Sequence, residues 1–256
     1  FMEKELLSEK NPLYGRATGI YRMREMGFYD AAKFFPDYSD RDKVLAYAVL
    51  GGIPHYLRQW NPKRSVDENI KQNILTKGCI LYSEVEFLLH QELRETPIYN
   101  SIIEAVALGN TKLNDISQKS LVEDTSKTSV YLKNLIELGI VEREFSVDAK
   151  IKEYGNSGRG IYRLTDNFFR FWYRFVPINM SAIDSGRIAK TYPHAVKQYL
   201  PDYMGLIYEK MCQDYLLYYS DSLPIELSEI GQWWGTDPKK KKQIQIDIVG
   251  TPVEGK

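Results

Sequence analysis

The Gly-Gly-Ile-Pro stretch at residues 51–54 limits the possible folds of this chain more than any other feature. It separates two apolar runs with helical spacing, residues 44–50 and residues 55–60. Two adjacent glycines allow the backbone to turn sharply, and the proline fixes its own φ angle. The sequence therefore predicts two helices that meet at a rigid corner, with an apolar proline face on which a flat ring can pack.

The composition predicts a soluble globular protein with a substantial core. The chain has 256 residues, of which 43% are hydrophobic, so we expect two or three modules. Basic and acidic residues both number 34, so no net field draws the chain toward nucleic acid or an acidic membrane. No uncharged apolar run reaches about eighteen residues, and residues 1–7 are charged rather than signal-like. We therefore expect a cytoplasmic protein without a membrane partner.

The order of elements predicts a mainly α fold with small β elements, an α+β arrangement. Residues 19–26 have the pattern of a short strand, but no other strand pattern lies near them. A lone strand followed by helices is typical of the last strand of a sheet. We therefore expect residues 1–27 to end a larger unit whose other strands precede residue 1.

Two helical modules are expected next. Residues 28–96 predict a small bundle, with Asp40 as the N-cap of one helix and residues 66–73 as another. Residues 97–165 predict three short helices and then two strands, residues 140–146 and residues 160–164. Three helices followed by a hairpin are typical of a winged helix.

Residues 166–256 predict a linker helix and an incomplete α/β domain. Asp166 opens an aromatic helix that Pro177 should end, because proline lacks a backbone donor. A helix over residues 203–219 then precedes strands over residues 224–230 and 243–249. A helix followed by two strands is the start of an α/β domain without its finish.

A phosphate-binding motif is missing from the sequence. No Gly-x-x-x-x-Gly-Lys-Ser/Thr loop occurs in it. The backbone N–H groups of such a loop surround the phosphates of a bound nucleotide. We therefore expect that this chain alone does not hydrolyse ATP.

Motifs along most of the chain resemble the archaeal-type ATPase family, a STAND-like, AAA+-related group of P-loop ATPases. In chain order they occupy residues 1–7, 12–16, 51–54, 166–175, 231–235 and 246–249. The resemblance implies a helical lid at residues 28–96 and a truncated PD-(D/E)XK-like domain within residues 166–256. It also implies that the chain is the portion after the P-loop core, that this core is its partner, and that the longer protein binds ATP or ADP.

The resemblance places three residues beside a nucleotide. Arg16 would lie near the phosphates, where a guanidinium can form paired hydrogen bonds. Gly52 and Pro54 would form the corner on which adenine packs. The alternatives are a surface arginine after a Tyr-Gly turn and a purely structural corner. Without the phosphate-binding half, we expect Pro54 to act here as a hinge without bound nucleotide.

Four residues of the predicted winged helix are candidates for contacts with duplex DNA. Lys127, Lys133 and Asn134 lie on the exposed side of its third helix, and Arg159 lies at the wing tip. Residues 110–163, however, carry nine basic and eight acidic residues. Because specific DNA binding usually needs a basic face, a spacer between domains is the alternative.

Two carboxylates are candidates for a catalytic Mg²⁺ site. By the resemblance, Glu209 on the long helix and Asp247 on the last strand would hold the metal and act in catalysis. The sequence departs from the family at Gln232 and Gln245, where arginine and glutamate are common, and the strand with Glu-x-Lys is missing. The alternative is that Asp247 is a strand-end residue of an inactive domain.

The resemblance, taken with the order of elements, implies the C-terminal regulatory and interaction half of a STAND-like ATPase, with a nucleotide-sensing lid coupled to a winged helix. Two other classes stay open: a stand-alone winged-helix transcription regulator that forms a homo-oligomer, and a metal-dependent nuclease. The strand at residues 19–26 discriminates between the first two. A compact regulator would pair it internally, whereas a fragment would leave it unpaired.

Overall fold

The computed structural model describes residues 10, 11, 16, 23–93, 95–122, 124–150, 154, 160–219, 221, 223–237, 239 and 241–253. This part of the chain is mainly helical and has two separate antiparallel sheets of two strands each, which confirms the predicted fold class. No described helix has the length and apolar character needed to cross a membrane.

The helices are short at the beginning of the described chain and longest toward its end. They are α2 (Phe28–Ala31), α3 (Asp40–Leu50), α4 (Pro54–Leu57), α5 (Val66–Asn69), α6 (Ile80–Glu92), α7 (Thr96–Ala107), α8 (Leu113–Lys119), α9 (Thr125–Glu137), α10 (Asn167–Asp184), α11 (Ile188–Ala195) and α12 (Leu200–Tyr218). Short 3-10 turns occupy Ala32–Phe34 and Lys197–Tyr199, and a π-helical turn occupies Ile70–Ile74. The strands are β1 (Val141–Glu144), β2 (Ile161–Leu164), β3 (Leu227–Asp237) and β4 (Lys242–Pro252).

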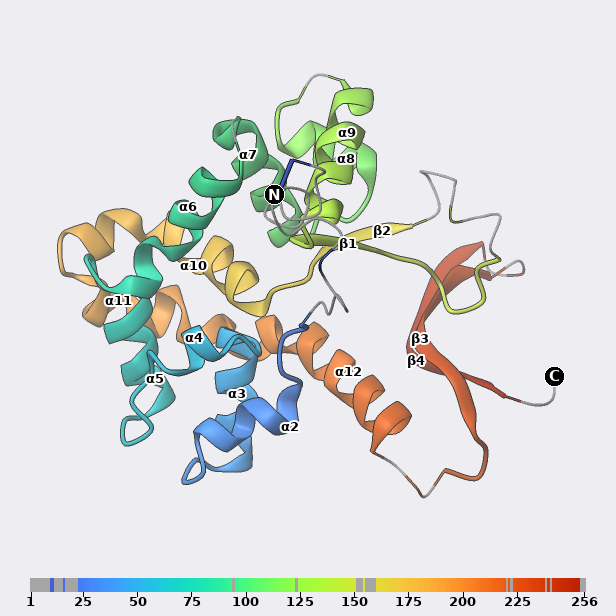
Figure 1. Cartoon of the computed structure of the whole chain (residues 1–256), viewed down its shortest axis with the longest axis horizontal. Coiled ribbons are helices and arrows are strands. Elements are labelled where there is room, and N and C mark those ends of the chain that lie inside the picture. The colour runs from blue at the N-terminus through green and yellow to red at the C-terminus, as the bar shows by residue number, and fades with distance from the viewer. Residues whose placement is uncertain are drawn as a thin grey trace.

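Helix α10 is the centre of the packing. It contacts α3, α6, α7 and α11, so it joins the first helices to the α7–α9 group (Figure 1). Phe168, Phe171 and Phe175 on it are fully buried, and Trp172 donates its indole N–H to the carbonyl oxygen of Tyr82 at 2.8 Å. Each buried aromatic side chain of this kind stabilises the fold by about 1.5–3 kcal/mol.

Pro177 does not end α10, so that prediction is wrong. The helix continues to Asp184, although Pro177 has no N–H to donate to the carbonyl oxygen of Tyr173. Beyond the proline, Ile183 is buried and Asn179 donates to the carbonyl oxygen of Phe175 at 2.8 Å. This packing offsets the missing backbone hydrogen bond.

Two other helix ends differ from the prediction. Ser39, not Asp40, caps α3, because the Ser39 hydroxyl accepts from the amide of Asp42 at 3.2 Å. Asp40 is instead the first helical residue, where its charge suits the helix dipole. The helix predicted over residues 66–73 is α-helical only to Asn69 and then widens into the π-helical turn.

The strand predicted at residues 19–26 is wrong for its described part. Residues 23–27 form neither a strand nor a helix. Met26 donates its amide to the carbonyl oxygen of Gly52 at 3.0 Å, so this segment is joined to the corner between α3 and α4. Residues 17–22 lie outside the described residues.

Helices α7, α8 and α9 are followed by the hairpin of β1 and β2, in the order that a winged helix requires. The hairpin pairs Val141 with Leu164 and Glu144 with Ile161. Gly139, with a φ of 74°, makes the turn out of α9. The division of the chain into domains stays a prediction.

The second hairpin, the β3–β4 ribbon, lies at one side of the molecule, where both of its strands contact α12 (Figure 1). Its β3 strand begins and ends later than predicted and includes Trp233 and Trp234. Strand β4 carries Ile244, Ile246 and Ile248, which are 40%, 48% and 36% exposed. We call these three residues the isoleucine row.

Candidate functional site

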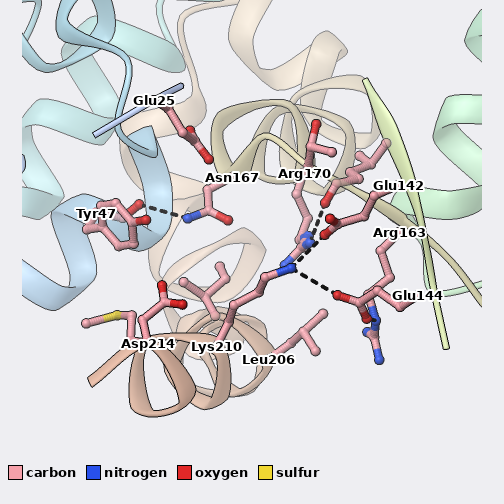
Figure 2. Close-up of a pocket in the computed structure, with 14 residues that line it drawn as sticks. Glu25, Tyr47, Glu142, Glu144, Arg163, Asn167, Arg170, Leu206, Lys210 and Asp214 are labelled. Atoms are coloured by element: carbon pink, nitrogen blue, oxygen red, sulfur yellow. Dashed lines mark hydrogen bonds and ion pairs between the residues drawn. The ribbon is translucent and has the colours of Figure 1, made fainter. Parts of the chain in front are cut away.

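A small cavity lined by several charged side chains lies where five parts of the chain meet. Its volume is about 120 Å³, and residues 23–27, α3, the β1–β2 hairpin, α10 and α12 all contribute to its lining (Figure 2). We call its charged side chains other than Asp214 the polar junction: Glu25, Glu142, Glu144, Arg163, Arg170 and Lys210.

Lys210 joins α12 to β1. Its ammonium lies 2.6 Å from a carboxylate oxygen of Glu142 and 3.0 Å from one of Glu144 (Figure 2). Burial opposes its charge, but the two carboxylates outweigh burial and raise the pKa of Lys210. Because half of the lysine side chain is exposed, the pairs together contribute about 1 kcal/mol at most.

Arg163 extends the junction from β2 to the ribbon. Its Nε lies 2.5 Å from Glu144, and its Nη2 donates to the side-chain oxygen of Gln232 at 2.8 Å. Gln232 in turn donates to Glu209 on α12 at 2.8 Å. Burial raises the pKa of Glu144, but Lys210 and Arg163 together hold it below its usual value. A continuous polar chain therefore links the first hairpin, the ribbon and α12.

Two carboxyl groups lie near the N-terminus of α10. Asp166 accepts hydrogen bonds from the amides of Phe168 at 2.6 Å and Phe169 at 3.2 Å, so it caps the helix as predicted. Glu25 accepts from the amide of Gly52 at 3.3 Å. Burial, and next the charge of Glu25, raise the pKa of Asp166 to about 7, and burial also raises the pKa of Glu25.

The corner predicted between two helices is present, and its glycines are used for close contacts. A Cβ on Gly52 would lie 1.8 Å from the carbonyl oxygen of Met26. Gly51 has a φ of 67°, which favours glycine. Pro54 is exposed at the first position of α4. Arg16 is exposed, and most of its neighbours lie outside the described residues, so nucleotide contact by these residues stays a prediction.

The structure places the candidate DNA-binding residues in different surroundings. Lys127 and Lys133 are exposed on α9. Asn134 donates its side-chain amide to the hydroxyl of Tyr99 at 2.8 Å, so this group holds α9 to α7. Arg159 lies outside the described residues. DNA contact stays a prediction.

Glu209 and Asp247 are neighbours across α12 and β4. Burial, and next the charge of Asp247, raise the pKa of Glu209. Gln213 on α12 donates to the backbone carbonyl of Asp247 at 2.8 Å, which holds β4 on the helix. The described residues contain no group of three or more histidine, cysteine, aspartate or glutamate side chains that could hold a metal ion. The metal site stays a prediction.

Sequence reasoning did not find the polar junction. Glu25, Glu142 and Lys210 belong to no motif, and their partners lie far away in the chain. Only a tertiary structure brings such residues together. Two residues beside the junction are named in the sequence analysis. Asp166 appears there as the start of a helix, and Gln232 as a departure from a family pattern.

The comparisons with known proteins cover different parts of the chain. Residues 172–256 match the model of the DUF234 family. This family is described as archaea bacterial proteins of unknown function. An uncharacterized protein of Methanocaldococcus jannaschii is 33% identical over 235 residues, which are 91% of this chain and 51% of that protein. The chain therefore spans about half the length of the curated relative that it matches.

One solved structure was also found to be similar, that of a Walker-type ATPase of Pyrococcus abyssi. It is 18% identical, with a TM-score of 0.43, and the match covers 66% of this chain and 48% of that chain. A TM-score this low carries no argument about the fold or the activity of this chain.

Proposed function

We propose that this chain is the regulatory part of a nucleotide-binding ATPase. It couples a P-loop core, supplied outside this sequence, to helix α12 and the β3–β4 ribbon. The nucleotide-binding part of the proposal rests on the motif resemblance. The observation that carries the coupling is the polar junction, because residues 23–27 reach it beside the α3–α4 corner, and α12 and the ribbon reach it from the other side.

The junction offers a physical route between its two sides. The charge of Glu25 acts on Lys210 and Glu142, and Lys210 holds β1 to α12. A displacement of residues 23–27 would therefore change the balance of charge at the ion pairs of Lys210. Interactions between partly buried charges are stronger than in water, so small movements have measurable effects.

The nucleotide part of the proposal is tested at Pro54. In the protein that carries the P-loop core, Pro54→Glu should weaken ATP binding about tenfold, a loss of about 1.4 kcal/mol. The exposed ring would no longer be available for adenine. The fold should persist, because glutamate suits the first turn of α4. Isothermal titration with ATP measures the affinity.

Pro36→Glu is the matched control, because Pro36 is also exposed and lies in a turn of the same group of helices. Its ATP affinity should equal that of the wild type. Unchanged affinity of the Pro54 variant, or an equal loss in the Pro36 variant, would remove adenine contact from the proposal.

The coupling part is tested at Lys210. Addition of ATP to the same protein should change the hydrogen exchange of the β3 amides, and Lys210→Met should reduce that change severalfold while ATP affinity stays the same. Lys190→Met, on the exposed surface of α11, is the control. An ATP response of β3 that is identical in the Lys210 variant and the wild type would contradict coupling through the junction.

A further inference from the structure

Residues 23–27 are held to the bundle through a few local contacts. Met26 donates to the carbonyl oxygen of Gly52, and the Gly52 amide donates to the carboxylate of Glu25. Glu25 is an exposed residue, and its carboxylate accepts a hydrogen bond at the corner. These residues have no helix or strand of their own, and besides these hydrogen bonds the side chain of Met26 packs against the hydrophobic core.

The carboxylate of Glu25 lies close to the start of α10. A Cβ on Gly51 would lie 3.3 Å from a carboxylate oxygen of Glu25 and 3.7 Å from the backbone nitrogen of Asn167. The residue before Asn167 is Asp166, which is fixed in place by the two amides that it caps. Two carboxyl groups therefore share one partly buried corner of the molecule.

The cations nearest to the pair have their closest contacts elsewhere. Arg170 donates to the carbonyl oxygen of Leu164 at 2.8 Å, and Lys210 is paired with β1. The ionisable groups that face the two carboxyls come from every element around them: Tyr47 on α3, Tyr56 on α4, Glu142 on β1, Arg170 on α10, and Tyr203, Lys210 and Asp214 on α12. The three tyrosines are neutral near pH 7, as an ordinary tyrosine is, and burial raises the pKa of each further.

We propose that Glu25 and Asp166 form a proton-operated latch, which holds residues 23–27 on the α3–α4 corner while the pair carries a proton and releases them when both carboxyls ionise. Two like charges at one poorly hydrated corner repel each other. Asp166 is held by its two hydrogen bonds to backbone amides, so Glu25 is the group that moves. Because Glu25 is an exposed residue, its carboxylate has a path to water. The latch needs no nucleotide, so it goes beyond the proposed function.

The direction of the pH effect follows from the protonated form. The pKa of each carboxyl is raised in the folded protein, so folding favours the bound proton. The latch is therefore closed at low pH. The free energy that stabilises its closed position is lost as the pH rises through about 7, the raised pKa of Asp166.

Hydrogen exchange of the Met26 and Gly52 amides tests the latch in the chain without nucleotide. After correction for the intrinsic exchange rates, protection of both amides should fall about tenfold between pH 6 and pH 8, as expected for one proton lost near neutral pH. Because no nucleotide is present, failure of this test leaves the proposed ATP binding untouched.

Three variants complete the experiment. Glu25→Gln keeps an acceptor for the Gly52 amide, and Asp166→Asn keeps an acceptor for the helix cap, so both should fold and show equal protection at the two pH values. Glu86→Gln, on the exposed surface of α6, should behave as the wild type. The latch is overturned if the wild-type protein shows equal amide protection at both pH values. It is also overturned if protection in the Glu25→Gln variant falls between pH 6 and pH 8 as much as it does in the wild type.

Discussion

Replacement of Gly52 by alanine should lower the free energy of unfolding by about 2–3 kcal/mol. The new methyl group would lie 1.8 Å from the carbonyl oxygen of Met26 and 2.7 Å from its nitrogen. Both atoms belong to the backbone and cannot rotate away as a flexible side chain can. Residues 23–27 must therefore move, and the hydrogen bonds that join Gly52 to Met26 and Glu25 are lost. Urea unfolding measures the effect.

Gly205→Ala is the matched control. Gly205 is exposed inside α12, and nothing lies within 4 Å of a Cβ placed on it. Alanine there should stabilise the protein by about 0.5–1 kcal/mol, because glycine is a poor helix former. Opposite signs at the two positions separate the close contact from a general effect of alanine. If the Gly52→Ala variant has the same unfolding free energy as the wild type, the corner does not need the close contact between the backbones of residues 26 and 52.

Between pH 4 and pH 8 the wild-type protein should lose unfolding free energy that an Asp166→Asn variant retains. The folded state raises the pKa of Asp166 from 3.8 to about 7. The contribution of this group is fully present below pH 3.8 and is lost as the pH rises through about 7. The shift corresponds to about 4 kcal/mol as an upper bound, because the side chain is partly exposed and release of Glu25 relieves part of the repulsion.

Urea unfolding of both proteins at pH 4, 6 and 8 gives this difference directly. Other groups also titrate over this range, so the quantity of interest is the gap between wild type and variant, not either curve alone. Asp37→Asn, at an exposed turn, is the control and should follow the wild type. If the wild-type and Asp166→Asn curves are parallel, the carboxyl of Asp166 is not titrating near neutral pH.

Local patterns in the sequence predicted much of the fold. Helical spacing located α3, α9 and α12, and the Asp166 cap was correct because the cap bonds only residues 168 and 169. The errors arose where packing competes with local preference. Pro177 would end an isolated helix, but the buried side chain of Ile183 beyond it helps to keep α10 continuous.

The candidate site was less accessible to sequence reasoning. The Lys210 pairs join α12 to a strand 66 and 68 residues away, and Glu25 meets Gly52 across 27 residues. Such ion pairs leave no spacing pattern, because either partner could be satisfied by many other side chains. The Gly-Gly-Ile-Pro corner was found, but its tightest neighbour, Met26, could not be.

The isoleucine row has a consequence for the handling of this chain in solution. Within the described residues, β4 pairs only with β3, so no described strand covers its other edge. Long edge strands with exposed β-branched residues promote self-association. The chain also has no net charge at pH 7, so charge repulsion does not keep molecules apart. Concentrated samples should therefore have the greatest colloidal stability at a pH well away from neutrality.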